Sequence, residues 1–168
     1  MERVSLFLGG ARSGKSHLAL AFAEALPGPH IFLATAQAFD DEMSERIDTH
    51  RQERDDRWRT IEAPLELASA VKQAGSSSVL IDCCTLWLSN VMLAERDVGN
   101  EVEKLLLALK SSSARIVLVS NEVGSGIVPD NKLGRDFRDE QGRLNQKLAG
   151  IADKVELVVA GLPLRIKG

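Results

Sequence analysis

The residues with the clearest chemical potential lie near the start of the chain, in the stretch GGARSGKS. This stretch fits the pattern G-x-x-x-x-G-K-[ST] at every fixed position, and it comprises Gly9, Gly10, Ala11, Arg12, Ser13, Gly14, Lys15 and Ser16. Glycines let backbone N–H groups turn inward around phosphate oxygens, the lysine reaches the outer phosphates, and the last hydroxyl ligates Mg²⁺. An apolar run precedes the stretch and good helix formers follow it, so the pattern predicts a nucleotide site rather than a chance glycine turn.

Asp82 is the second candidate, because it ends the continuous apolar run of residues 78–82. The carboxyl ends of parallel strands face the ligand crevice, and phosphate-loop enzymes hold Mg²⁺ there, directly or through water. The alternative is that Asp82 caps a helix expected from residue 86. The phosphate loop nearby favours the metal role, with Ser16 and Asp82 as the predicted ligands.

His50 is the third candidate, in a helix expected over residues 40–54. It shares one face of that helix with two apolar residues, which is also typical of a structural core histidine. Arg46, Arg51 and Arg54 lie within one turn of it. Their guanidinium groups would keep the imidazole neutral and nucleophilic and would attract a triphosphate. The other two histidines, His17 and His30, are expected to be exposed or structural.

A glycine-containing loop expected over residues 121–131 follows an apolar strand and carries the acid Glu122 at the strand tip. Its position and composition suggest a loop that faces substrate. Arg135, Arg138 and Arg143 on the following helix either contact phosphates or form a solvated face.

These candidates need a scaffold in which strands and helices alternate, which predicts an α/β fold with a mostly parallel sheet covered by helices. The expected strands are residues 4–8, 30–36, 78–82, 114–120 and 155–160, with a short strand or extended connection at 58–62 and an antiparallel edge strand at 164–166. The expected helices are residues 18–26, 40–54, 65–74, 86–95, 101–110 and 133–151.

Composition restricts the functions that remain. The 168 residues suit one nucleotide-binding domain over 1–168, and a net charge of −3 disfavours a nucleic-acid partner. No apolar run approaches the ~20 residues that span a bilayer, and the early first strand leaves no room for a secretory signal. Cys83 and Cys84 are adjacent, which disfavours a disulfide or a zinc site and suits buried thiols in a reducing cytoplasm.

Several stretches, in order along the chain, resemble the bifunctional adenosylcobinamide kinase / adenosylcobinamide-phosphate guanylyltransferase family of cobalamin biosynthesis. They are the phosphate loop, Ala34-Thr35-Ala36, Asp41-Glu42-Met43 with Arg46-Ile47 and His50-Arg51, Trp58-Arg59-Thr60 with Glu62, Asp82-Cys83 with Thr85-Leu86-Trp87 and Asn90, and Ser120-Asn121-Glu122-Val123-Gly124 with Ile127-Val128-Pro129. The resemblance implies a RecA-like P-loop NTPase fold and a homotrimer.

The resemblance also implies two reactions. ATP or GTP phosphorylates the aminopropanol hydroxyl of adenosylcobinamide, and GMP is then transferred from GTP to that phosphate, giving adenosylcobinamide-GDP and pyrophosphate. His50 matches the residue that carries GMP. Beyond the phosphate loop, the nucleotide contacts that carry over are Ala34, Thr35, Ala36, Arg51, Gln52, Glu53, Arg54, Glu62 and Asp82. On the residues alone, a plain small-molecule kinase with a structural His50 and a non-catalytic GTP-sensing module stay open.

Overall fold

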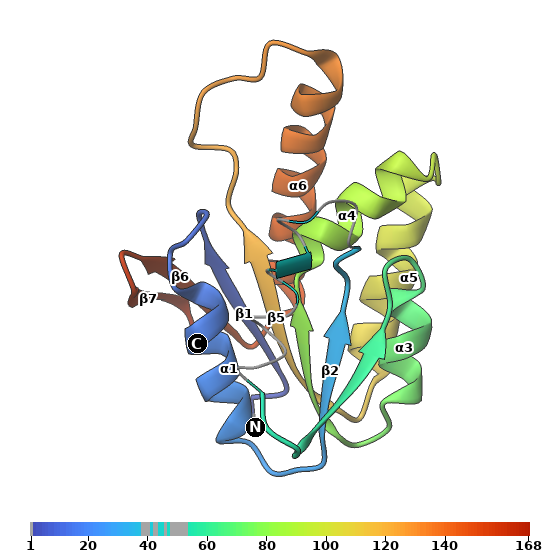
Figure 1. Cartoon of the computed structure of the whole chain (residues 1–168), viewed down its shortest axis with the longest axis vertical. Coiled ribbons are helices and arrows are strands. Elements are labelled where there is room, and N and C mark those ends of the chain that lie inside the picture. The colour runs from blue at the N-terminus through green and yellow to red at the C-terminus, as the bar shows by residue number, and fades with distance from the viewer. Residues whose placement is uncertain (1, 38–40, 42–43, 46, 48–53) are drawn as a thin grey trace.

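One seven-stranded sheet forms the centre of the computed structural model, which describes residues 2–37, 41, 44–45, 47 and 54–168 (Figure 1). The strands are β1 (Val4–Gly9), β2 (His30–Ala34), β3 (Trp58–Glu62), β4 (Ser78–Asp82), β5 (Arg115–Asn121), β6 (Lys154–Val159) and β7 (Leu162–Lys167). Their order across the sheet is β3-β2-β4-β5-β1-β6-β7. All neighbours are parallel except β6 and β7, which confirms the parallel sheet and the antiparallel edge strand expected near the C-terminus.

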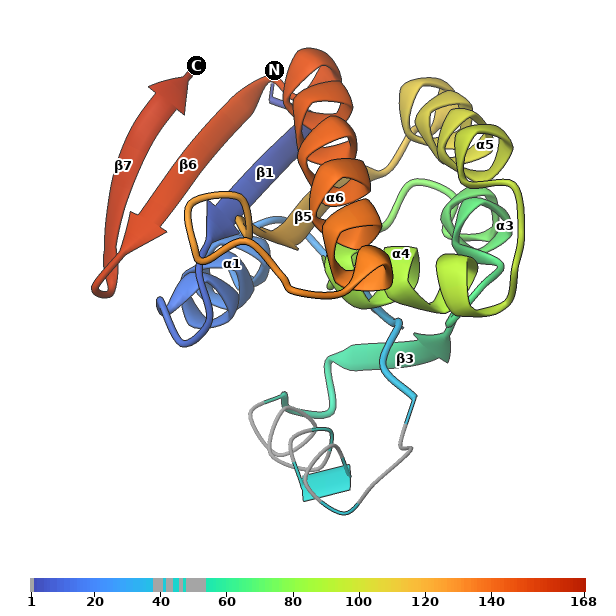
Figure 2. The same cartoon turned by 90° about the horizontal axis from the view of Figure 1, so that it is seen from above.

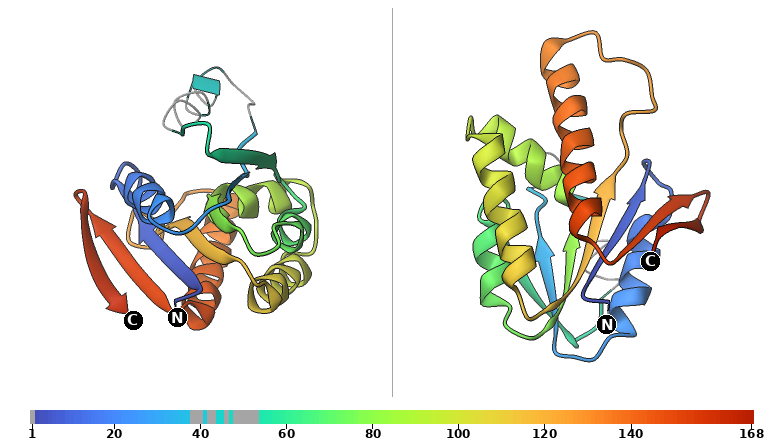
Figure 3. Two further views of the ribbon diagram at one scale, coloured as in Figure 1. Left: turned by 90° about the horizontal axis from the view of Figure 1, so that it is seen from below. Right: turned by 180° about the vertical axis from the view of Figure 1, so that it is seen from behind.

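Helices cover both faces of this sheet. They are α1 (Lys15–Glu24), α3 (Leu67–Gln73), α4 (Cys84–Leu93), α5 (Val98–Ser111) and α6 (Lys132–Ile151). α1 packs on one face, and α3, α4, α5 and α6 cover the other (Figures 2 and 3). Side chains alternate along a strand, so Leu6 and Phe7 of β1 are buried in the two opposite cores. A strand buried on both faces reads as a continuous apolar run, which is why β1, β4 and β5 were predictable.

Several helices begin earlier than their sequence patterns indicate. α1 starts at Lys15 because Gly14, at φ 92°, ends the preceding loop and its carbonyl accepts from the Leu18 N–H at 3.1 Å. α5 starts inside the break expected near residues 97–100, since the Asp97 carboxylate accepts from the Asn100 N–H at 2.8 Å and caps the helix. Gly142 leaves α6 uninterrupted.

The expected helix of residues 40–54 lies mostly outside the described residues. Asp41, Ser44, Glu45 and Ile47 are helical, in agreement with the expectation. Within the described part of the chain, no helix has the length and apolar character needed to cross a membrane.

Candidate functional site

The phosphate loop, residues 9–16, joins the end of β1 to the start of α1, as predicted. Arg12 and Gly14 adopt positive φ angles of 55° and 92°, which turn the backbone between strand and helix. Glycine adopts such angles without strain, whereas arginine does so at a cost. The Ser13 carbonyl accepts from the Gly161 N–H at 2.8 Å, so the β6–β7 turn supports the loop from outside.

Gly9 is required by packing rather than by its φ angle. A Cβ atom added there would lie 2.4 Å from the Ser13 Oγ and 2.7 Å from the Val158 carbonyl oxygen. Both distances are far below van der Waals contact, so any larger residue would push the loop away from β6. The first glycine of the motif therefore keeps the loop close to the sheet.

Lys15 holds its ammonium group at the beginning of the same loop. Its Nζ donates to the Gly10 carbonyl at 3.0 Å, and the side chain is buried. Burial lowers the pKa of Lys15, and the nearby Asp82 carboxylate offsets part of that shift. A poorly hydrated cation at this place interacts strongly with a phosphate that replaces its carbonyl partner.

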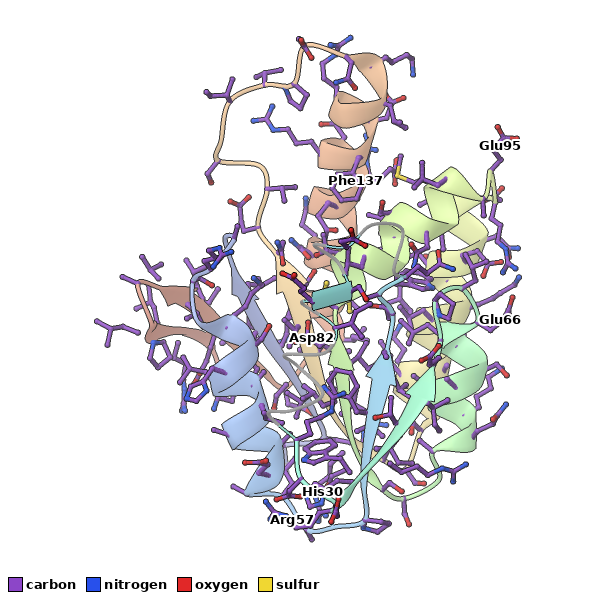
Figure 4. All side chains as sticks on the ribbon, viewed as in Figure 1. His30, Arg57, Glu66, Asp82, Glu95 and Phe137 are labelled. Atoms are coloured by element: carbon purple, nitrogen blue, oxygen red, sulfur yellow. The ribbon has the colours of Figure 1, made fainter. Side chains whose placement is uncertain are left out.

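The register of three neighbouring strands aligns three residues that are far apart in the sequence. Ala34 of β2 pairs with Glu62 of β3 on one side and with Asp82 of β4 on the other. All three lie at the carboxyl ends of their strands, and Asp82 is seen there in Figure 4. His30 lies at the opposite end of the sheet, where its Nε2 contacts the Leu26 carbonyl at 3.0 Å and its ring packs on Trp58. That position confirms a structural His30, while His17 is exposed, as expected.

The helix-capping alternative for Asp82 is wrong. α4 begins at Cys84, and the capping residue is Cys83, whose Sγ accepts from the Leu86 N–H at 3.4 Å. Cys83 and Cys84 are both free and buried, as expected. Burial raises the pKa of the Cys83 thiol to about 12 and raises that of Cys84 as well, so both stay protonated.

Thr35 is fully buried, and its hydroxyl is engaged within the protein. It donates to the Cys83 carbonyl at 2.7 Å and accepts from the Cys83 N–H at 2.9 Å. The Asn90 side-chain amide donates to the Thr35 carbonyl at 2.8 Å and to the Pro64 carbonyl at 3.0 Å. These hydrogen bonds join the end of β2 to the start of α4, so the Thr35 hydroxyl fixes the backbone around the site. The next residue, Ala36, is half-buried.

Arg54 packs against the sheet on the face that α1 covers. Its guanidinium carbon lies 3.5 Å from the centre of the Phe32 ring, a cation–π contact that holds the end of the segment between β2 and β3. The predicted residues His50, Arg51, Gln52 and Glu53 lie outside the described residues.

The two predicted metal ligands, Ser16 and Asp82, have the chemical character that Mg²⁺ requires. Ser16 at the start of α1 and Asp82 at the end of β4 supply a hydroxyl and a carboxylate, the hard oxygen ligands that Mg²⁺ prefers. The Asp82 carboxylate raises the pKa of Lys15 against the effect of burial. In the described ranges, no three histidine, cysteine or acidic residues gather as a metal cluster.

A buried polar network at the end of β5 was not foreseen. The Ser120 hydroxyl donates to the Asn145 Oδ1 at 2.7 Å, and the Gln141 amide donates to both groups at 2.9 Å. Asn145 also donates to the Asn121 carbonyl at 2.9 Å, and the Asn121 N–H donates to the Thr85 hydroxyl at 2.7 Å. The helix is polar overall, but Gln141 falls on the stripe of Phe137, Leu144 and Leu148, a spacing that turns it toward the sheet. Its hydrogen-bond partners follow only from the packing of the helix on β5.

The arginines that follow the loop of residues 121–131 hold its backbone. Arg138 donates to the Gly124 carbonyl at 2.5 Å and Arg135 to the Pro129 carbonyl at 3.0 Å. Arg143 pairs with Glu140 on the helix surface. The phosphate-contact hypothesis for these three residues therefore finds no support in their geometry.

A shallow pocket of about 420 Å³ opens beside the phosphate loop, and we call it the β6 pocket. Residues 10–13 of the loop and 157–160 of β6 and its turn line it, together with Glu122 and Ser125. The Glu122 carboxylate accepts from the Gly124 N–H at 2.6 Å and the Ser125 N–H at 3.3 Å. Burial raises the pKa of Glu122, but these hydrogen bonds and Arg138 outweigh it and lower the pKa overall.

Comparison with known proteins agrees with the features of this site. The family model for cobinamide kinase / cobinamide phosphate guanyltransferase matches residues 5–166. The bifunctional adenosylcobalamin biosynthesis protein CobP of Pseudomonas aeruginosa is 45% identical over 167 residues, covering 97% of this chain and 96% of that protein. The corresponding protein CobU of Salmonella typhimurium is 41% identical over 182 residues, covering 96% and 98%.

Solved structures with low sequence identity share the fold. The P4 protein of bacteriophage phi6 in complex with ADP has a TM-score of 0.50 at 17% identity, covering 96% of this chain and 52% of its own. An ATPase of a bacterial type III secretion system has a TM-score of 0.54 at 13% identity, covering 97% of this chain and 56% of its own. The chain thus spans about half the length of these two structures, and their shared fold is that of P-loop NTPases.

Proposed function

Because the chain belongs to the cobinamide kinase / cobinamide phosphate guanyltransferase family, we propose that it catalyses both reactions in cobalamin biosynthesis. In the first, ATP or GTP phosphorylates the hydroxyl of adenosylcobinamide. In the second, GMP passes from GTP to adenosylcobinamide-phosphate, and adenosylcobinamide-GDP and pyrophosphate are formed. The observation that carries this proposal is the family match over residues 5–166, and the buried Lys15 ammonium on the Gly10 carbonyl supports phosphate binding by the loop.

The phosphate loop is proposed to serve both reactions. The N-terminus of α1 and the N–H groups of residues 10–16 bind phosphate oxygens, and Lys15 stabilises charge on the outer phosphates. Glu62, Ala34 and Asp82 form a row across the carboxyl ends of β3, β2 and β4, and the remaining nucleotide contacts are proposed to lie along this row. Such groups are in place before the reaction, so they stabilise the developing charge without reorganisation.

Mg²⁺ is proposed to bind Ser16 and Asp82, directly or through water. When bound, it would neutralise the phosphate oxygens and orient the transferring group. The chain's own contribution is to hold the hydroxyl in the first turn of α1 and the carboxylate at the carboxyl end of β4.

We assign the guanylyl transfer to His50, as the family resemblance implies. A neutral imidazole is a good nucleophile toward phosphorus, and a covalent GMP intermediate divides one difficult displacement into two easier steps. The segment that carries His50 starts beside the row of site residues at Ala34, and Arg54 near its end packs on Phe32. Arg51, Gln52, Glu53 and Arg54 are proposed to contact the nucleotide.

Labelling with α-³²P-GTP tests this assignment. We expect the wild type to acquire label in an acid-labile, base-stable bond, and His50→Asn to stay unlabelled while it still phosphorylates adenosylcobinamide. A labelled His50→Asn would overturn the role of His50. Phosphorylation without any protein-bound GMP would favour the plain kinase, and GTP binding without turnover would favour a sensing module.

The whole chain is proposed to act as one transferase domain, in a cytoplasmic homotrimer, as the resemblance and the two free cysteines suggest. Sedimentation equilibrium of the purified protein tests the trimer, because a monomer mass over the micromolar range would contradict it.

A further inference from the structure

The β6 pocket is adjacent to the place where the outer phosphate must lie. Lys15 reaches the outer phosphates in sites of this kind, and its Nζ contacts the carbonyl of Gly10, which itself lines the pocket. The Glu122 N–H also donates to the Gly9 carbonyl at 3.0 Å, so Glu122 is fixed to the start of the loop. In the view from above, the segment between β5 and α6 runs over this end of β1 (Figure 2).

The lining of the pocket suits an alcohol on a short apolar arm. Leu157 and Val159, two residues apart on β6 and therefore on the same face of the sheet, form an apolar wall. Among the described lining residues, Glu122 alone carries a carboxylate. The two turn N–H groups that bind this carboxylate keep it ionised, and an ionised carboxylate accepts a hydrogen bond from a hydroxyl. Asp82 is assigned to the metal, so it does not compete for this role.

We propose that the β6 pocket binds the aminopropanol arm of the phosphate acceptor and that Glu122 is the general base of the kinase reaction, an inference that rests on the proposed function. The acceptor oxygen forms a bond to the γ-phosphorus while the bond from that phosphorus to the β–γ bridging oxygen breaks. The hydroxyl proton passes to the Glu122 carboxylate and then to water, and the nucleoside diphosphate leaves. Guanylylation of the protein by GTP needs no acceptor, so it does not involve Glu122.

Glu122→Gln tests the base. We expect kcat for adenosylcobinamide phosphorylation to fall by about 10²-fold or more, with labelling of the protein by α-³²P-GTP unchanged within about twofold. Glu140→Gln is the matched control, because it makes the same change on α6, where Glu140 pairs with Arg143 and does not line the pocket. A Glu122→Gln kcat equal to that of the wild type or of Glu140→Gln would overturn the catalytic role.

Val159→Arg tests the pocket, because Val159 is 58% exposed and an arginine there fills the space without disturbing the core. We expect the KM for adenosylcobinamide to rise by about tenfold and the KM for the nucleotide to stay constant. Leu107→Arg, at a position 64% exposed on α5, is the control for an apolar-to-arginine change. A raised nucleotide KM would assign the pocket to the nucleotide base and overturn the proposal, as would an unchanged acceptor KM.

Failure of the proposed function and failure of the Glu122 inference would give different results. A wild type that transfers no phosphate to adenosylcobinamide and takes no label from GTP would overturn both the function and this inference. An active wild type with an equally active Glu122→Gln would overturn the inference alone.

Discussion

The Thr35 hydroxyl forms two hydrogen bonds with the backbone of Cys83, donating to its carbonyl at 2.7 Å and accepting from its N–H at 2.9 Å. All atoms involved are buried, and the pair joins the residue that follows β2 to the residue that follows β4. Since Ala34 and Asp82 precede these two residues, this pair fixes the distance between two proposed nucleotide contacts.

Thr35→Val is therefore expected to destabilise the protein. The valine has the same shape but leaves the Cys83 N–H and carbonyl without this partner, at a cost of about 1–3 kcal/mol in the free energy of unfolding. Urea denaturation measures the change. Thr35→Ser keeps the hydroxyl and loses only the methyl group, so it serves as the control. An equal loss in both variants would mean that the hydrogen bonds contribute no more to stability than the packing of that methyl group.

Lys15→Met is expected to abolish nucleotide turnover without weakening the fold. Both reactions should slow by at least about 10²-fold, because the cation that stabilises phosphate charge is gone. Burial lowers the pKa of Lys15 in the folded protein, so at neutral pH the charged form is disfavoured there relative to the unfolded chain.

The pH dependence of the free energy of unfolding tests whether the pKa of Lys15 is lower in the folded protein than in the unfolded chain. The burial cost of Lys15 is present below its folded pKa and is relieved as the pH rises from that value toward the ordinary lysine value of 10.5. Over this window the free energy of unfolding of the wild type should gain on that of Lys15→Met. Parallel curves for the two proteins would contradict the burial of the ammonium.

A buried ion pair on β6 gives a third prediction. Lys154 Nζ lies 2.9 Å from a Glu156 carboxylate oxygen, both side chains are nearly enclosed, and the ammonium sits 4.3 Å from the centre of the Phe22 ring. Glu156→Gln leaves a buried cation without its counter-charge, so we expect a loss of about 3–5 kcal/mol in stability. The double variant Lys154→Met with Glu156→Leu should recover most of that loss in the same denaturation assay, and failure to recover would point to packing instead of charge.

Asp153 gives a prediction at acid pH. Its carboxylate accepts from the Val4 N–H at 2.9 Å and the Arg3 N–H at 2.8 Å, which lowers its pKa and anchors the start of β1. The stabilisation is complete above the unfolded value of 3.8 and is lost as the pH falls through the lower folded pKa. Because Asp153 is exposed to solvent, Asp153→Ala should cost only about 0.5–1 kcal/mol at pH 7 and progressively less below pH ~4. An equal cost at both pH values would exclude the ionised carboxylate as the cause.

Local patterns were enough to predict the phosphate loop and most of the strands. The order of glycines, lysine and serine over residues 9–16 determines the turn and its hydrogen bonds within a few residues, and the buried strands are continuous apolar runs. Helix starts were less predictable, because caps such as Cys83 and Asp97 depend on where the preceding backbone is held.

The sequence by itself determined that this protein has a phosphate loop and an alternating α/β chain, since both depend on contacts between near neighbours. Only the tertiary structure decided which distant residues meet that loop. The strand order separates β4 from β1 by β5 alone, and the register aligns Glu62, Ala34 and Asp82 in one row. The buried network of Gln141 and Asn145 anchors the end of β5, and Glu122, which follows it, lines the same pocket as Gly10. These placements come from long-range packing and strand register, which no local spacing encodes.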